Sequence, residues 1–378
     1  MTKSKKLLIV GVHLKSEGYP NVKYRVSALK KSYPYCEEFN LPMWDESGLG
    51  KQGRYSILKS GGRMLWAHLL VMFKFVLCGK GGVVYVPYPS MFICFIASFL
   101  PRTVRPKKLV IDAFISIYDT VVCDRKILSK NSLSAKILRK VEERAFKVAD
   151  VIVTDAPLNS EYYSQLFDID SAKFLAIPLS TNESDYYYTP YIARTDGVCR
   201  VLFVGTFIPL HGIGTIVDTI SLLANDSSIF FTLIGDGEEA YRLNQLLDSD
   251  LNNYEWISEW QSSKNISKYI RASDICLGIF GVTEKASRVC PYKIYAYSLC
   301  GRPVITACSD WMKACGALNA FKFISSGDHV QLAREIVSLA SNEDERVLLS
   351  ERSHDFYEYS LSNLGAAIHF HECLLGSG

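Results

Sequence analysis

The sequence lacks a long uninterrupted apolar run, an internal repeat and a low-complexity tract. The apolar stretch 83–100 contains Pro87 and Pro89, so it predicts a strand, a turn and a helix in place of a membrane span. The apolar run 7–12 that follows the basic first residues is too short for a signal-peptide core. Eleven cysteines occur without one CxxC pair, which favours reduced structural thiols over a zinc site.

Each half of the chain is short of charges of one sign. Residues 1–195 hold 28 Lys and Arg against 17 Asp and Glu, and residues 196–378 hold 14 against 22. Such a split indicates two domains with different partners. The basic clusters 102–108 and 51–63 either attract phosphates and acidic lipid headgroups or are solvated surface. We expect a cytoplasmic protein that could contact the anionic inner face of the plasma membrane. Nucleic acid is not an expected partner, because no recognised binding module accompanies the charge.

Short apolar runs alternate with amphipathic segments along the whole chain. With 378 residues, 48% of them hydrophobic, the chain can build two cores. Helices are predicted between strands at 6–12, 82–86, 109–112, 151–154, 174–177, 200–204, 229–234, 254–256, 275–279 and 303–306. This alternation of helices with buried strands is typical of parallel α/β sheets.

The polar, tyrosine-rich segment 181–198 separates the two charge regimes, and a strong strand begins directly after it. We predict an N-terminal domain over residues 1–190 and a C-terminal domain over 198–355. A final helical segment, 356–378, is expected to pack back on the first domain. Both domains are predicted to be doubly wound and Rossmann-like. Because ligands bind at the carboxyl ends of the strands in such sheets, the two domains are expected to face a central cleft.

Two glycine-rich turns follow strands in the second domain. The first places Gly205, Thr206, His211 and Gly212 between a strand and a helix. Backbone N–H groups there can approach a phosphate, although glycines can equally serve only a tight turn. The second turn surrounds Gly235, and its acidic neighbours make it a poor phosphate site. It fits the wall of a nucleoside pocket or a purely structural turn.

The most informative segment is 278–306. A loop that carries Lys285 and Arg288 leads to Pro291, which suits the first turn of a helix, and Lys293 follows in that helix. Three cations near one helix N-terminus would form a diphosphate site. The alternative is a solvated basic face.

The segments 205–214, 234–238 and 285–306 together resemble the donor-binding domain of retaining, family-4-type glycosyltransferases. These are GT-B enzymes of bacterial polysaccharide and lipopolysaccharide assembly. The resemblance covers residues 200 to about 356, and the block 291–305 is its most specific part. The first half is similar only in its general layout. The donor-binding residues expected on this basis are Gly205, Thr206, His211, Gly212, Gly235, Lys285, Arg288, Lys293, Ile294 and Ala296.

The chain departs from the family pattern at two places. The family has a Glu-x7-Glu pair around the donor helix, and the corresponding residues here are Arg288 and Ala296. The second glutamate binds the donor ribose hydroxyls in the family, so its loss could cost about 1.5–3 kcal/mol of binding. The site has drifted, or the protein is an inactive paralogue, or the alanine was introduced. Arg and Lys are common in the first glycine-rich loop of the family, where this chain has Thr206 and His211.

The first half offers two groups of candidates. Asn21, Lys23 and Arg25 follow the first strand and could meet donor phosphates or an acidic acceptor, or they are surface residues at a helix start. The strand 109–112 is followed by a segment whose residues could serve catalysis or acceptor orientation, and a buried Asp there could equally be a helix cap. The candidates in and after this strand are Asp112, Ser116, Tyr118 and Asp119.

The resemblance implies transfer of a sugar from a nucleotide sugar to a glycan or a polyprenyl-linked oligosaccharide, with retention of configuration. The cations would stabilise the leaving diphosphate, which could itself accept the proton of the acceptor. No DxD-type motif occurs in the expected donor region, so neither a metal nor another cofactor is expected. Two alternatives remain. One is a sugar-nucleotide epimerase of the same fold, and the other is a non-catalytic glycan-binding or assembly partner, which Ala296 would favour.

Overall fold

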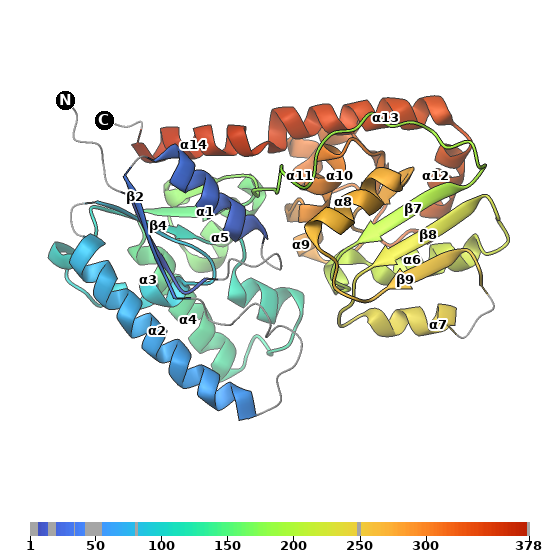
Figure 1. Ribbon diagram of the computed structural model, residues 1–378. Coiled ribbons are helices and arrows are strands. Elements are labelled where there is room, and N and C mark those ends of the chain that lie inside the picture. Colours follow the sequence, from blue (N-terminus) through green and yellow to red (C-terminus); the bar gives the residue numbers. More distant parts are fainter. Residues whose placement is uncertain are drawn as a thin grey trace. The chain divides into compact units, whose positions relative to one another are not determined.

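The computed structural model describes residues 7–13, 20–33, 35–41, 55–79, 82–247 and 251–375 (Figure 1). The chain divides into two compact units. The first unit contains Met1–Ser180 and Asn363–Gly378, and the second contains Thr181–Ser362. Each unit has its own six-stranded parallel sheet, which confirms the expected α/β fold class.

The sheet of the first unit has the strand order β2-β1-β3-β4-β5-β6. Its strands are β1 (Leu7–Gly11), β2 (Cys36–Asn40), β3 (Val83–Val86), β4 (Lys108–Asp112), β5 (Val151–Thr154) and β6 (Phe174–Ala176). Nearly every residue of β1, β3, β4 and β5 is buried, as expected for strands that are covered on both faces.

Alternate strand residues contact the helices on opposite faces of this sheet. One layer contains α2 (Tyr55–Gly79), α3 (Met91–Ala97), α4 (Leu133–Val148) and α5 (Pro157–Phe167), which pack on Leu8, Val84 and Leu109. The other contains α1 (Pro20–Ser32) and α14 (Asn363–Leu375), which pack on Ile9 and Tyr85. None of the helices in the described part of the chain combines the length and the apolar character that a bilayer-crossing helix needs.

The sheet of the second unit has the order β12-β11-β10-β7-β8-β9. Its strands are β7 (Cys199–Val204), β8 (Ile229–Ile234), β9 (Tyr254–Ile257), β10 (Ile275–Leu277), β11 (Val304–Ala307) and β12 (Lys322–Ile324). The core on one face includes α6 (Ile213–Leu222), α7 (Asn244–Leu247) and α12 (His329–Ala340). The remaining helices are α8 (Ser263–Ala272), α9 (Glu284–Arg288), α10 (Tyr292–Leu299), α11 (Asp310–Ala314) and α13 (Glu343–Phe356).

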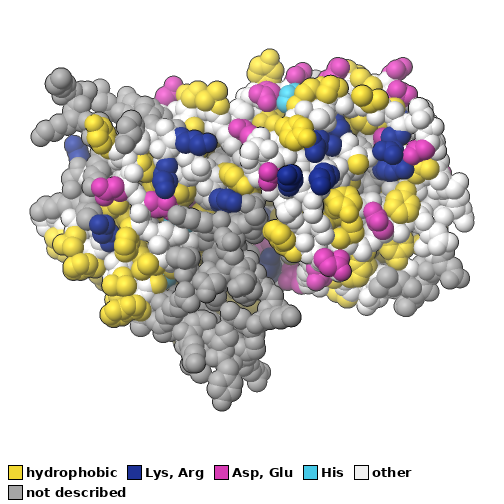
Figure 2. All heavy atoms as spheres, viewed as in Figure 1, with side chains coloured by type: hydrophobic (Ala, Val, Ile, Leu, Met, Phe, Trp, Pro, Cys, Tyr) yellow, Lys and Arg dark blue, Asp and Glu magenta, His cyan; other side chains and the backbone are white. Residues whose placement is uncertain are grey.

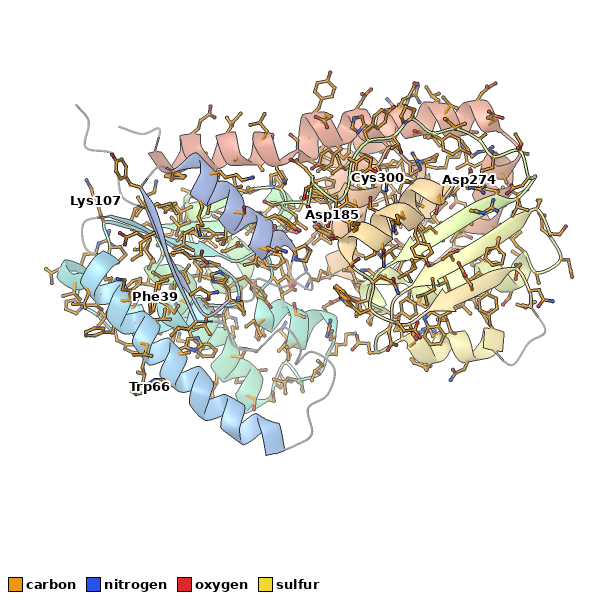
Figure 3. The ribbon with its side chains drawn as sticks, viewed as in Figure 1. Phe39, Trp66, Lys107, Asp185, Asp274 and Cys300 are labelled. Carbon is orange, nitrogen blue, oxygen red and sulfur yellow. The ribbon has the colours of Figure 1, made fainter. Side chains whose placement is uncertain are left out.

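The tyrosine-rich segment 181–198 belongs to the second unit. The guanidinium of Arg302 donates hydrogen bonds to the carbonyl and the hydroxyl of Thr189, both at 2.9 Å. The Tyr191 hydroxyl donates to Asp274 at 2.8 Å, and Asp274 is labelled in Figure 3. These buried polar contacts explain why the division of the chain falls at Ser180 and Thr181 and not after residue 190.

Candidate functional site

The loops after β7, β8 and β10 meet at the carboxyl edge of the second sheet. Gly212 has a φ of +67°, and a Cβ atom there would lie 2.6 Å from the backbone of Phe280. A Cβ atom on Gly235 would lie 2.0 Å from the carbonyl oxygen of Gly205. Both glycines are therefore required by close backbone packing between loops. A phosphate-binding role for the Gly205–Gly212 loop stays a prediction.

Lys293 extends from α10 into the space beneath the first of these loops. Its Nζ lies 3.8 Å from the centre of the Phe203 ring and 3.5 Å from the carbonyl oxygen of Gly278. A Cβ atom on Gly205 would lie only 2.8 Å from this Nζ, so the amine abuts the loop. Burial lowers the pKa of Lys293 well below its ordinary value, and no charged neighbour among the described residues offsets the effect.

His211 and Thr206 complete this group. The Nδ1 atom of His211 is hydrogen-bonded to the carbonyl oxygen of Thr206, and the His211 ring lies edge-on to Phe203 at 5.8 Å. Its Cε1 would lie 3.1 Å from a Cβ atom on Gly205. The structure therefore brings together Gly205, Thr206, His211 and Lys293. Ile294 does not join this group. Its side chain packs against Gly278 at the end of β10, where a Cβ atom on the glycine would lie 3.1 Å from Cδ1 of Ile294.

Lys285 and Arg288 lie in a helix of their own, which contacts the turn Pro209–His211. The sequence predicted a loop that gathers them with Lys293 at the N-terminus of one helix. The structure places both residues in the separate one-turn helix α9, which is capped by the Thr283 hydroxyl, and an extended backbone follows at Val289 and Pro291. The short helix forms because Thr283 accepts a hydrogen bond from the backbone of Ala286.

A cavity of about 290 Å³ opens beside α9. It lies at the carboxyl ends of β10 and β11, and its lining is rich in hydroxyl groups. The polar side chains of the lining come from Thr283, Glu284, Ser287, Cys308, Ser309 and Ser326. The sequence analysis did not name these residues. Four of them are Ser or Thr in the segments that follow β10, β11 and β12, which is the signal that the sequence offered.

Ala296 follows Lys293 by one turn of α10 and is only 3% exposed. Residues three apart on a helix lie on the same face, so the two side chains are neighbours. The phenol of Tyr297 on this face accepts a hydrogen bond from the backbone N–H of Val204 at 2.9 Å. This bond holds α10 against the end of β7, and it fixes the position of Lys293.

In the first unit, Arg25 and Asp112 contact each other. An Nη of Arg25 lies 3.2 Å from Oδ2 of Asp112, and the Tyr85 hydroxyl donates to the same oxygen at 2.5 Å. Arg25 also donates to the carbonyl oxygens of Ile177 and Pro178. The pair is buried, at 3% exposure for each residue. This geometry matches a structural ion pair, and neither side chain is exposed to a substrate in the first unit alone.

The neighbouring candidates of the first unit lie nearby on α1. The side-chain oxygen of Asn21 accepts a hydrogen bond from the backbone of Ser180 at 2.8 Å. The amine of Lys23 lies 5.4 Å from the centre of the Tyr24 ring. Asn21 therefore fastens α1 to the segment that leaves the unit. The basic side chains of 51–63, also named from the sequence, lie outside the described side chains.

Glu142 organises the segment that carries Ser116, Tyr118 and Asp119. Its carboxylate accepts hydrogen bonds from the Ser116 hydroxyl at 2.8 Å and from the N–H groups of Ile117 and Tyr118, both at 2.9 Å. Asp119 is fully buried, and Tyr118 is 3% exposed. The burial of Glu142 raises its pKa from 4.5 to about 7, against the opposing effect of these donors. The sequence analysis missed Glu142, which lies in the middle of α4 with the pattern of an ordinary helix.

Replacing Glu142 with glutamine is expected to remove a pH dependence of stability. The folded state holds the carboxyl proton up to about pH 7, whereas the ordinary value is 4.5. The stabilisation is complete below pH 4.5 and is lost as the pH rises through 7, a change of about 3 kcal/mol. Urea unfolding at pH 5 and pH 8 measures this difference. The neighbouring variant Glu143→Gln is the control. If the free energy of unfolding changes equally between pH 5 and pH 8 in Glu142→Gln and in the native protein, the assignment is contradicted.

Among the described residues, no group of three or more His, Cys, Asp or Glu side chains is arranged to hold a metal ion. Beside the hydroxyl-lined cavity, the carboxyl edge of the second sheet carries the buried amine of Lys293, the imidazole of His211 and backbone amides. These groups can bind an anion.

Residues 199–342 match the family model described as glycosyl transferases group 1. No sequence among the curated proteins matches the chain. HepE of Anabaena in complex with UDP has 13% identity and a TM-score of 0.67, with 98% of this chain and 100% of that chain covered. Sucrose-phosphate synthase of Thermosynechococcus elongatus has 13% identity and a TM-score of 0.68, with 98% of both chains covered.

A third solved structure, the lipopolysaccharide outer core galactosyltransferase WaaB, has 12% identity and a TM-score of 0.61. The alignment covers 98% of this chain and 99% of the WaaB chain. At these identities the likeness shows the fold alone. Residues 199–342 of the second unit are thus similar to the glycosyl transferases group 1 model, and the chain has a GT-B-like fold with two six-stranded parallel sheets.

Proposed function

We propose that this protein transfers a sugar from a nucleotide sugar to a glycan or lipid-linked glycan, and that Lys293 binds the diphosphate of the donor. The observation that carries the proposal is the buried amine beside Gly205 and His211, within the segment that matches the glycosyltransferase model. HepE was solved with UDP and with UDP-glucose, so uridine nucleotides are the first donors to test.

The charge of Lys293 would act at the leaving group. The amine is buried against neutral groups, the Gly278 carbonyl and the Phe203 ring, so an arriving anion would supply its counter-charge in a medium of low dielectric constant. As the bond between the sugar and the diphosphate breaks, the leaving oxygen gains negative charge, which the ammonium stabilises. The acceptor oxygen forms the new bond, and its proton passes to the departing phosphate. Retention of configuration and independence of metal ions are parts of this proposal.

We further propose that the protein is a family-4-type enzyme, which transfers a hexose during the assembly of a polysaccharide or lipopolysaccharide. The block 291–305 supports it, as does the likeness to the galactosyltransferase WaaB. Calorimetric titration with UDP, GDP and ADP tests the donor site directly. Incubation with the sugar nucleotide alone then tests the rival reaction, since an epimerase forms the epimer without an acceptor.

Ala296→Glu is expected to tighten the binding of UDP about 10- to 100-fold. A carboxylate there would lie next to Lys293 and could accept hydrogen bonds from ribose hydroxyls, at about 1.5–3 kcal/mol. Calorimetry compares it with Ala296→Gln, which has the same size without the charge. Because Ala296 is buried, a melting curve must show that each variant is folded. An unchanged affinity in folded Ala296→Glu would show that the ribose does not lie there, and absent binding in all three proteins would favour a non-catalytic partner.

A further inference from the structure

Helix α2 is apolar on two sides. Ala67, Val71 and Phe75 face the core and are at most 8% exposed. From Trp66 onward, where its side chains are described, the opposite side is also apolar, and its members are Trp66 at 64%, Leu69 at 51%, Phe73 at 66% and Leu77 at 61% exposure. Their spacing of three and four residues places them on one outward stripe. Figure 3 shows Trp66 on the outer side of the helix.

The stripe continues onto the neighbouring helices of the same layer. Phe92 and Phe99, in and just after α3, are 37% and 60% exposed, and Leu133 and Ile137 of α4 are 73% and 55% exposed. Hydrophobic side chains gather on this side of the first unit, over α2 and α3 (Figure 2). We call this set of exposed side chains on α2, α3 and α4 the apolar face. Large apolar areas on a protein surface mark an interaction site.

The charges beside the apolar face are positive. Within α4, whose residues are all described, the acidic residues Glu142 and Glu143 are buried, and every exposed or half-exposed charge is a cation. These cations are Lys136, Arg139, Lys140, Arg144 and Lys147. Three of them, Arg139, Lys140 and Lys147, share the single carboxylate of Glu143 at 3.7, 3.6 and 2.7 Å, so the exposed side of α4 keeps an excess of positive charge. The guanidinium of Arg144 lies 4.4 Å from the centre of the Phe99 ring, so cations and aromatic rings share one surface.

We propose that the apolar face docks on an anionic phospholipid bilayer. Trp66 and Phe73 would enter the boundary between headgroups and acyl chains, where aromatic side chains are favoured, and the cations of α4 would contact lipid phosphates. A second copy of the chain fits this surface less well, because it would bring like charges together. The interaction does not depend on the proposed transferase activity.

Cosedimentation with vesicles of equal parts phosphatidylglycerol and phosphatidylcholine tests the proposal. The native protein is expected to bind these vesicles at least 10-fold more tightly than vesicles of phosphatidylcholine alone. The variant Trp66→Gln/Phe73→Gln should lose at least 10-fold in affinity for the anionic vesicles. The variant Lys136→Gln/Lys140→Gln should bind more weakly and lose part of its salt dependence.

Matched variants of the second unit serve as controls. Ile192 and Leu222 are 81% and 54% exposed, so Ile192→Gln/Leu222→Gln removes a comparable apolar area. Lys264→Gln/Lys268→Gln removes two exposed cations from α8. Both controls should bind vesicles like the native protein. Native protein that ignores anionic vesicles, or a Trp66→Gln/Phe73→Gln variant that binds them unchanged, overturns the proposal. A third outcome also overturns it: the native protein forms a concentration-dependent dimer, and the Trp66→Gln/Phe73→Gln variant alone does not. The apolar face would then be a self-association surface.

Discussion

Lys293→Met is expected to weaken the binding of UDP about 100-fold and, at the same time, to raise the stability of the second unit. The loss of a charge-assisted contact to the diphosphate corresponds to about 2–3 kcal/mol. The gain in stability arises because the amine is buried with one long hydrogen bond, to Gly278, and methionine fills the same space without a polar group. Removing a buried amine whose hydrogen bonding is incomplete contributes about 1–3 kcal/mol of stability. Calorimetry and thermal melting measure the two effects on one sample.

The opposite signs of these two effects make the test decisive. If Lys293 were structural, its removal would lower the stability of the second unit. If it binds the donor, its removal should raise stability, because a binding residue can be kept at a cost to stability. Lys264→Met on the exposed side of α8 serves as the control and should change neither quantity. Lys285→Met reports separately on the cation of α9 that was predicted from the sequence. If Lys293→Met binds UDP like the native protein, the diphosphate site lies elsewhere.

Asp112→Asn is expected to destabilise the first unit by about 3–5 kcal/mol, because it leaves the guanidinium of Arg25 buried without its counter-charge. Arg25 also donates to the carbonyl oxygens of Ile177 and Pro178, which carry no charge that could replace the carboxylate. The double variant Arg25→Met/Asp112→Leu should recover much of the loss, since it removes both charges together. Urea denaturation of the three variants measures the effect, and the coupling energy follows from a double-mutant cycle.

An exposed ion pair provides the comparison. Lys313 lies 3.0 Å from Asp310, and both side chains are more than half exposed. Lys313→Met should therefore change stability by less than about 1 kcal/mol. The sequence analysis considered Asp112 a catalytic candidate, and the two roles differ in outcome. Unchanged stability of Asp112→Asn together with lost turnover would favour the catalytic role.

The central strands were predictable from the sequence, and the two strands that were missed both lie at sheet edges. The runs of β1, β3, β4 and β5 are apolar because both faces of the sheet are covered there. In contrast, β2 has the sequence Cys-Glu-Glu-Phe-Asn and is only partly buried, and β12 has three residues. An edge strand needs little apolar surface, so its pattern is close to that of a loop.

The site was less predictable than the fold. Single loops around Gly205, Gly212 and Gly235 were apparent from the sequence, but the contact between Lys293 and Gly205 joins residues 88 positions apart and depends on how α10 packs against β7. The loop expected around Lys285 is instead a separate helix that begins after Thr283, and the grouping of Lys285 with Lys293 stays a prediction. Glu142 was missed since its role comes entirely from burial, which its helical pattern does not distinguish from a solvated face.

The return of α14 to the first sheet has a consequence for biosynthesis. Phe370 packs edge-on against Tyr85 at 5.7 Å, so the last helix contributes to a core whose strands leave the ribosome first. The intervening segment Thr181–Ser362 contains a complete sheet of its own. During synthesis the core around Leu7 and Ile9 is therefore complete only after residue 370 has been made, whereas all strands of the second sheet are available earlier.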